Sequence, residues 1–317
     1  MATDTAKVTI AICMSTLHRA AGLEATLQSV ALQRQSLPSR FTVIAVVVNN
    51  DPNDAAPAQV VERVKSETGL HIEYAKEAQR GVAPPRNCAL RIAQKSVGIN
   101  GLIAFIDDDE IADKAWLAEL LSVKHMYGVA IVTGPVVSQF DHSPPAWIIE
   151  GGFFSQTVLA TGTPRRWAFT NNILFDASLL SGMDRWFDPH YLRAGEDRHF
   201  FQRLVANGAR IVWAADARVT EIITSSRACA PWLIRRQRSV GRCVAPIERE
   251  LYGATYARVN CTFRGATWIA LGSIMTLAGC MSTRRRVRGN MWSAWGIGLI
   301  EGAWRPKVSG TPVQSTD

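Results

Sequence analysis

Residues 101–110 read Gly-Leu-Ile-Ala-Phe-Ile-Asp-Asp-Asp-Glu, a short apolar run that ends in four consecutive acids. The apolar half is typical of a strand buried on both faces of a parallel sheet. Open α/β sheets bind ligands at the carboxyl ends of their strands, which is where these acids lie. If the backbone stays extended, Asp107 and Asp109 point to the same side and suit Mg²⁺ or Mn²⁺ carrying a diphosphate. The alternative is a solvated acidic loop that caps the next helix.

Strand-like and helix-like segments alternate around this run. The expected strands are residues 8–13, 42–48, 71–75, 101–106, 130–133, 168–175, 210–214 and 218–221. The expected helices are residues 22–33, 58–67, 83–94, 114–125 and 196–207. This order predicts βαβ units and therefore an α/β fold with a doubly wound, mostly parallel sheet. Residues 141–166, rich in Gly and Pro, are interpreted as a long loop and a candidate active-site flap.

A second acidic pair, Glu196-Asp197, follows Gly195 at the start of a predicted helix. The helix dipole and the free amides of the first turn hold a carboxylate ionised there, and an ionised Asp can act as a general base. A plain helix cap is the other interpretation. The chain lacks GxxxxGK[ST] and has no GxGxxG after its first strand, which argues against P-loop kinases and dinucleotide oxidoreductases.

Six blocks of sequence together resemble the family 2 nucleotide-sugar glycosyltransferases, particularly bacterial members that build cell-surface polysaccharide. The blocks are residues 8–13 with Arg19 and Gly22-Leu23, 46–52, 81–90, 105–110, 134–136 and 195–197. They fall in order across about residues 7–245. Where many relatives carry Asp after the second strand, this chain has Asn49, which can bond a uracil edge but brings no charge. Extra residues also precede Arg19.

The resemblance implies a GT-A fold and an inverting transfer of a sugar from a nucleotide-diphosphate donor, expected to be a UDP-sugar, to a lipid-linked or surface glycan. It implies that Asp109 and Asp107 bind the metal, Mg²⁺ or Mn²⁺, and that Asp197, with Glu196 beside it, is the catalytic base. Donor-binding roles are implied for Asn49, Asp51, Arg86, Asn87, Asp107, Asp108, Asn171, Asn172, Arg235 and Arg238. For the last two, the alternative is contact with lipid phosphate beside a membrane helix.

Two other classes of function remain open from the residues. A sugar nucleotidyltransferase also uses an acidic strand end but does not need the Gly-Glu-Asp base, and a non-catalytic membrane-attached subunit would bind a sugar nucleotide or a glycan. His190 and His199 flank the proposed base, where they either contact metal or acceptor or serve in packing.

The C-terminal third differs from the rest in charge. Residues 227–307 carry 14 Lys or Arg against three acids, interleaved with Trp. This pattern favours an anionic membrane surface over nucleic acid. The uncharged segment 265–281 is interpreted as an interfacial or re-entrant helix, a membrane span or a soluble packing helix.

The expected organisation is therefore a catalytic domain over residues 1–226, a helical, membrane-associated extension over 227–307 and a disordered tail over 308–317. The six cysteines form no CxxC pair, and we expect them to be reduced thiols. The N-terminus shows no secretory signal, so the catalytic domain is expected on the cytoplasmic face of the inner membrane, with the protein bound peripherally or monotopically.

Overall fold

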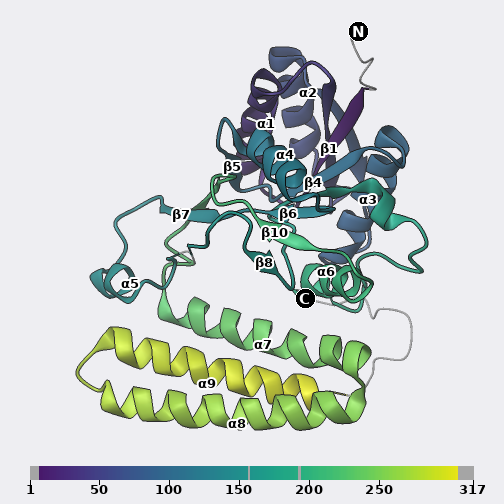
Figure 1. Ribbon diagram of the computed structural model, residues 1–317. Coiled ribbons are helices and arrows are strands. Elements are labelled where there is room, and N and C mark those ends of the chain that lie inside the picture. The colour runs from purple at the N-terminus through teal and green to yellow at the C-terminus, as the bar shows by residue number, and fades with distance from the viewer. Residues whose placement is uncertain (1–6, 156–157, 192–193, 306–317) are drawn as a thin grey trace.

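The computed structural model describes residues 7–155, 158–191 and 194–305, and its centre is an eight-stranded sheet (Figure 1). The strands are β1 (Val8–Thr16), β2 (Phe41–Asn49), β3 (His71–Lys76), β4 (Leu102–Ile106), β6 (Ile131–Thr133), β8 (Pro164–Arg165), β9 (Asn172–Asp176) and β10 (Ile211–Trp213). Their order is β3-β2-β1-β4-β9-β6-β10-β8. β3, β2, β1 and β4 are parallel, β9 is antiparallel to β4 and β6, and β10 is parallel to β6. The expected mostly parallel α/β sheet is confirmed.

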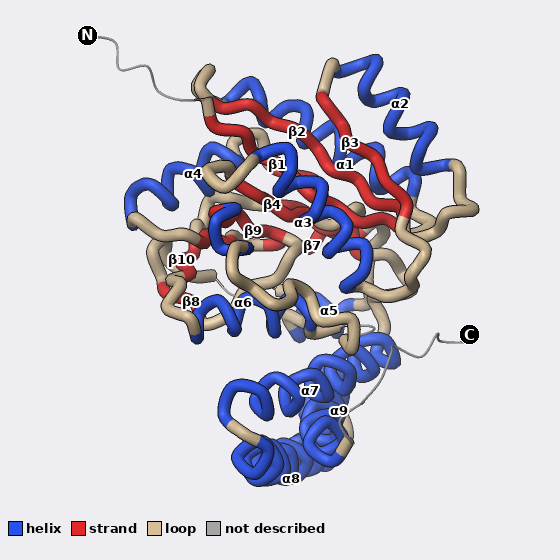
Figure 2. The backbone as a smooth tube through the Cα atoms, turned by 90° about the vertical axis from the view of Figure 1, so that its right-hand side faces the viewer, coloured by secondary structure: helices blue, strands red, loops and turns tan. Residues whose placement is uncertain are grey.

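Helices cover both faces of the sheet, as Figure 2 shows. α1 (Ala20–Gln33), α2 (Ala56–Thr68) and α4 (Trp116–Tyr127) pack on one face, and α3 (Ala83–Val97) and α6 (Glu196–Ala206) pack on the other. β1 explains why both faces are covered, because successive side chains of a strand alternate between faces and residues 10–14 of β1 are all apolar and fully buried. Short 3₁₀ helices, η1 (Arg34–Ser36) and η2 (Ala177–Leu180), complete the α/β part of the chain.

A second, three-stranded sheet lies beside the carboxyl end of β4. It consists of β5 (Glu110–Ala112), β11 (Val219–Ile223) and β7 (Val136–Phe140) in the order β5-β11-β7. The sequence predicts β11 but not β5 or β7, and in the structure each of these two strands is paired with β11, which lies far from both in the sequence. The expected loop over residues 141–166 is also partly ordered, since it contains α5 (Ala146–Gly151) and β8.

Three long helices form the C-terminal region: α7 (Ala230–Tyr252), α8 (Ala254–Ala278) and α9 (Thr283–Trp304). α7 lies nearest to the α/β part and α8 lies farthest from it, in both Figure 1 and Figure 2. α9 packs against both neighbours. The expected helical character of this region is confirmed, and residues 265–278 belong to α8. No helix within the described ranges has both the length and the apolar character needed to traverse a bilayer. The expected tail, 308–317, lies outside the described residues.

Candidate active site

The acidic run at the end of β4 folds into a tight turn instead of continuing as a strand. The Asp107 N–H donates to the Glu110 carboxylate at 3.0 Å, and the Glu110 N–H donates to the Asp107 carbonyl at 3.3 Å. Gly22 at the start of α1 makes room for this turn, since a Cβ there would lie 2.7 Å from the Asp108 carbonyl oxygen. Asp107 and Asp109 are therefore not placed by an extended backbone, and the turn sets where their carboxylates lie.

The four acids of the run have different surroundings. Asp107 and Asp109 are partly exposed, whereas Asp108 and Glu110 are buried. Burial raises the pKa of Glu110 well above its usual range, and the charge of Asp107 raises it further. Burial also raises the pKa of Asp108 to about 6, although the charge of Arg19 opposes the rise. Asp108 keeps one buried carboxylate oxygen without a hydrogen-bond partner in the described structure. Asp107 and Asp109 thus present the accessible oxygens.

Two arginines from distant parts of the chain converge on Asp109. Arg19, just before α1, donates to Asp109 at 2.7 Å and to Asp108 at 3.1 Å. Arg227, in the loop before α7, donates to the same Asp109 oxygen at 3.1 Å and to Glu221 of β11 at 2.5 Å. Arg227 is not among the site residues expected from the sequence. Its position just after the last predicted strand is the one feature of the sequence that could have suggested a role in the site.

A third arginine joins the two acidic motifs. Arg86, in the first turn of α3, lies 3.4 Å from an Asp107 carboxylate oxygen and forms an ion pair with Glu196. Arg86 and Glu196 are 13% and 2% exposed, so this pair is shielded from water. Burial raises the pKa of Asp197, while the positive charge of Arg86 opposes that rise. Motifs that lie about 90 residues apart in sequence therefore share one electrostatic site.

The start of α6 depends on a glycine. Gly195 precedes Glu196 with φ +98°, a left-handed conformation, and a Cβ there would lie 2.6 Å from the Cys243 side chain of α7. Cys243 donates to the carbonyl of Ala194 at 2.9 Å. The segment that carries the two acids is thus held against α7, which closes this end of the site.

Asn49 and Asp51 stand at the end of β2, two strands from β4. The Asn49 amide donates to the Asp54 carbonyl at 2.9 Å and to the Tyr74 hydroxyl at 3.2 Å, and it accepts from the Asp51 N–H at 3.0 Å. The Asp51 carboxylate lies 3.3 Å from His18 and 3.4 Å from Arg80. Asp51 is therefore set in a polar cluster, while Asn49 mainly holds the loop after β2.

Asn87 and Asn172 also have their amides occupied. Asn87 exchanges two hydrogen bonds with the backbone of Phe187, at 2.7 and 3.0 Å. Asn172 accepts from the Trp116 indole at 2.8 Å and donates to the carbonyls of Pro135 and Ala217 at 2.8 and 2.7 Å. Both side chains fix loops around the site. Asn171, half-buried, directly precedes β9.

Arg235 and Arg238 of α7, which were expected to bind the donor, are placed differently from the other predicted site residues. Arg238 pairs with Glu301 of α9, and Arg242 one turn later does the same. Arg235 is exposed on α7. The structure thus brings Asp107, Asp109, Arg86, Glu196 and Asp197 together, but it directs Arg238 to the helical region.

The histidines belong to a separate ion-pair cluster. Asp188, His199 and Glu250 offer ligand atoms within 4.8 Å of one another, a spacing that could hold a metal. However, Arg185 lies 3.4 Å from Asp188 and 2.9 Å from Glu250, so both carboxylates already have a cationic partner. Burial lowers the pKa of His199, which favours its neutral form. His190 lies 2.7 Å from Asp188. We interpret this cluster as a clamp between α6 and α7.

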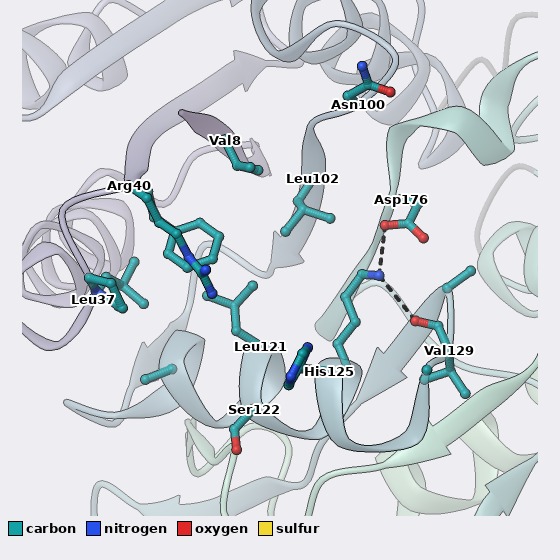
Figure 3. Close-up of a pocket in the computed structure, with 16 residues that line it drawn as sticks. Val8, Leu37, Arg40, Asn100, Leu102, Leu121, Ser122, His125, Val129 and Asp176 are labelled. Atoms are coloured by element: carbon teal, nitrogen blue, oxygen red, sulfur yellow. Dashed lines mark hydrogen bonds and ion pairs between the residues drawn. The ribbon is translucent and has the colours of Figure 1, made fainter. Parts of the chain in front are cut away.

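A cavity of about 760 Å³ lies at the opposite edge of the sheet (Figure 3). It is lined by residues at the amino ends of β1 and β4, including Val8 and Leu102, and by residues of α4. Asp176, the acid among its lining residues, is paired with Lys124 at 2.9 Å. The residues that line this cavity therefore do not include two neighbouring carboxylates that could share a metal. The candidate site is the edge of the sheet at the carboxyl ends of the strands.

A family model and a relative of known name both match this chain. Residues 11–180 match the family model described as Glycosyl transferase family 2. The succinoglycan biosynthesis protein ExoM of Rhizobium meliloti (strain 1021) is 30% identical over 238 residues, covering 75% of this chain and 74% of that protein.

Two solved structures show the same fold. S. aureus TarS 1-349 in complex with UDP has a TM-score of 0.54 at 14% identity, covering 90% of this chain and 89% of that chain. The mannosyltransferase PcManGT from Pyrobaculum calidifontis, in complex with GDP-Man and Mn²⁺, has a TM-score of 0.62 at 18% identity, covering 95% and 88%. At these identities the likeness concerns the fold alone.

Proposed function

This chain belongs to glycosyl transferase family 2, and we propose that it catalyses an inverting, metal-dependent transfer from a nucleotide-diphosphate sugar to a glycan. The observation that carries the proposal is Arg86, which contacts Asp107 at one end of the site and Glu196 at the other. Arg86 therefore links the carboxylates proposed to bind the metal and diphosphate to the acidic pair that contains the proposed base. We propose a UDP-sugar as the first donor to test, because S. aureus TarS was solved with UDP.

The metal would be held by Asp107 and Asp109. Both present accessible carboxylate oxygens, which are the hard ligands that Mg²⁺ and Mn²⁺ prefer. Mn²⁺ accompanies the donor in the PcManGT structure. A bound divalent cation would offset the negative charge of the departing nucleoside diphosphate. Arg19 and Arg227 hold positive charge at the same place, so the chain itself also favours an anionic leaving group.

Asp197 is proposed as the base that takes a proton from the acceptor hydroxyl. Burial raises its pKa, which makes its carboxylate a stronger proton acceptor than an exposed one. The positive charge of Arg86 opposes that rise and so favours the ionised carboxylate. A base that activates the acceptor hydroxyl fits a single displacement, in which the hydroxyl attacks the anomeric carbon from the face opposite the diphosphate. We therefore propose inversion at that carbon.

The acceptor is proposed to be a lipid-linked or surface glycan at the cytoplasmic face of the inner membrane. The support is the relative ExoM, whose name places it in succinoglycan biosynthesis. Asp188 and Glu250 are proposed to stay outside the reaction, because Arg185 forms an ion pair with each of them.

Product analysis tests the proposal. The full chain is incubated with UDP-sugars and GDP-mannose, with Mn²⁺, Mg²⁺ or a chelator, and with a membrane extract as acceptor source. We expect a free nucleoside diphosphate that depends on metal and acceptor. Pyrophosphate would indicate a nucleotidyltransferase, and donor binding without turnover would indicate a binding subunit. Either result would overturn the proposal.

A further inference from the structure

α8 presents an apolar stripe on its outer side. Its members recur every three or four residues, which is the spacing of one helix face. They are Tyr256, Val259, Phe263, Ala266, Ala270, Ile274 and Leu277, and Met281 continues the stripe just after the helix. The six large side chains are between 51% and 97% exposed. Exposed apolar surface of this extent on one helix marks an interaction site.

The opposite side of α8 is fixed to the protein by glycines. A Cβ on Gly265 would lie 2.7 Å from the Gly296 carbonyl, and one on Gly272 would lie 2.5 Å from the Gly289 carbonyl. Such close backbone contact leaves no room for α8 to turn its stripe inward. α8 is also the helix farthest from the catalytic part in both views (Figure 1, Figure 2). The stripe is therefore held outward and away from the active site.

The charged residues within the segment that carries the stripe all have one sign. Residues 251–300 contain six arginines and no acid. Arg285 and Arg286, next to Met281 at one end, are exposed and form no ion pair within the described residues. Glu150 of α5 approaches only Arg284 there, at 3.9 Å. At the other end Arg258 lies over the Trp304 ring at 5.8 Å.

A shallow groove of about 530 Å³ crosses the stripe at its Trp304 end. It is lined by Thr255, Arg258, Val259, Thr262, Phe263 and Trp304. Apolar walls beside one guanidinium suit a lipid, whose acyl chain is apolar and whose headgroup is anionic. Trp and Tyr side chains near both the apolar and the charged surface are typical of an interfacial helix.

From this arrangement we propose that the outer face of α8 docks on an anionic lipid surface. The occupant is a bilayer and not a second copy of the chain. Two such faces placed together would bring arginines against arginines with no acid of the same segment to pair with them, whereas anionic headgroups complement them. The proposal is independent of the chemistry of the active site.

Vesicle flotation of the full chain tests the proposal. We expect binding to vesicles of phosphatidylcholine mixed with phosphatidylglycerol and much weaker binding to phosphatidylcholine alone. The double variant Phe263→Asp, Leu277→Asp places charge in the stripe at exposed positions and should abolish binding at every salt concentration. Arg285→Glu, Arg286→Glu should weaken binding by at least about tenfold at low salt, because each arginine near such a surface contributes on the order of 1 kcal/mol.

Met126→Asp is the matched control, since Met126 is an exposed apolar residue of α4 in the catalytic part. It should bind vesicles like the wild type, and all variants should keep wild-type thermal unfolding. Wild-type protein that ignores anionic vesicles at low salt would overturn the proposal. So would a stripe variant that binds like the wild type, or a dimer in solution that the stripe variant alone abolishes while vesicles are ignored.

Discussion

Arg227 donates a hydrogen bond of 3.1 Å to Asp109, although 118 residues separate the two in sequence. Arg19 donates to the same carboxylate oxygen at 2.7 Å. Two cations therefore compete with any metal for Asp109. In the proposed function they would also provide a positively charged wall for the diphosphate of the donor. Because Arg227 stands where the catalytic part meets α7, the helical region is tied to the donor end of the site.

Removing Arg227 should strengthen metal binding. Arg227→Gln deletes one of the two cations that contact Asp109. Because this cation repels a metal ion at the same carboxylate, we expect the apparent Kd for Mn²⁺ to fall by roughly tenfold. Electron paramagnetic resonance titration of free Mn²⁺ measures this directly. Arg218→Gln is the control, because Arg218 is exposed and pairs with Asp216. Weaker Mn²⁺ binding in Arg227→Gln would show that Arg227 holds the site together instead of opposing the metal.

Asp109→Asn should remove metal-dependent donor binding. The substitution keeps the size of the side chain and deletes the charge that a divalent cation needs. We expect the thermal shift caused by UDP-sugar with Mn²⁺ to disappear, and unfolding without ligand to change by less than about 1 kcal/mol because the ion pairs lost are partly exposed. Asp113→Asn, at an exposed position close by, should behave like the wild type. An Mn²⁺-dependent shift of wild-type size in Asp109→Asn contradicts the assignment.

Asp197→Asn should separate binding from chemistry. Loss of a general base lowers turnover by roughly 10² to 10⁴, while donor affinity stays because the proposed metal ligands are untouched. Release of nucleoside diphosphate measures turnover, and thermal shift measures donor binding. Near-normal turnover in this variant would exclude Asp197 as the base.

Glu196→Gln is the matched comparison for Asp197→Asn. Glu196 is buried against Arg86, so its loss leaves this guanidinium with only the longer 3.4 Å contact to Asp107 and should cost up to about 3 to 5 kcal/mol of stability. Asp197→Asn should be much closer to the wild type in urea unfolding. If Glu196→Gln loses turnover at wild-type stability, the two acids have exchanged roles.

The sheet and both acidic motifs could be predicted because their signals are local. An apolar strand ending in acids and a glycine before an acidic helix start are readable in a few consecutive residues. Arg227 was missed, since its partner Asp109 lies far away in sequence and only the paired second sheet brings them together.

The asparagines show a second reason why site residues could not all be predicted from the sequence. Asn49, Asn87 and Asn172 all stand near strand or helix ends, where a ligand-binding amide and a loop-holding amide have the same sequence surroundings. The structure shows each of them hydrogen-bonded within the protein. Their predicted donor contacts stay predictions. The same holds for Arg238, whose partner Glu301 lies 63 residues later on another helix.

The stability difference between Asp108→Asn and the wild type should depend on pH. The folded-state pKa of Asp108, about 6, lies above the ordinary value of 3.8. Its contribution therefore favours folding below about pH 4 and is lost as the pH rises through 6. Asp108→Asn mimics the protonated acid, so the variant should be more stable than the wild type at pH 7, by about 3 kcal/mol at most, and equal to it near pH 4. Urea unfolding at both pH values measures this. A stability difference between variant and wild type that is the same at pH 4 and pH 7 would contradict this prediction.

Glu301 should give the opposite pH dependence. Hydrogen bonds from Arg238 and then Arg242 lower its pKa to about 2, so its contribution is present above pH 4.5 and is lost as the pH falls through 2. Glu301→Gln should therefore lower the free energy of unfolding at pH 7 by about 1 to 2 kcal/mol, a value reduced for solvent exposure. The loss should shrink below pH 4.5. Glu62→Gln, which breaks an exposed pair with Lys65 on α2, should change stability by less than about 0.5 kcal/mol at every pH. If Glu301→Gln matches that control, the link between α7 and α9 does not depend on this ion pair.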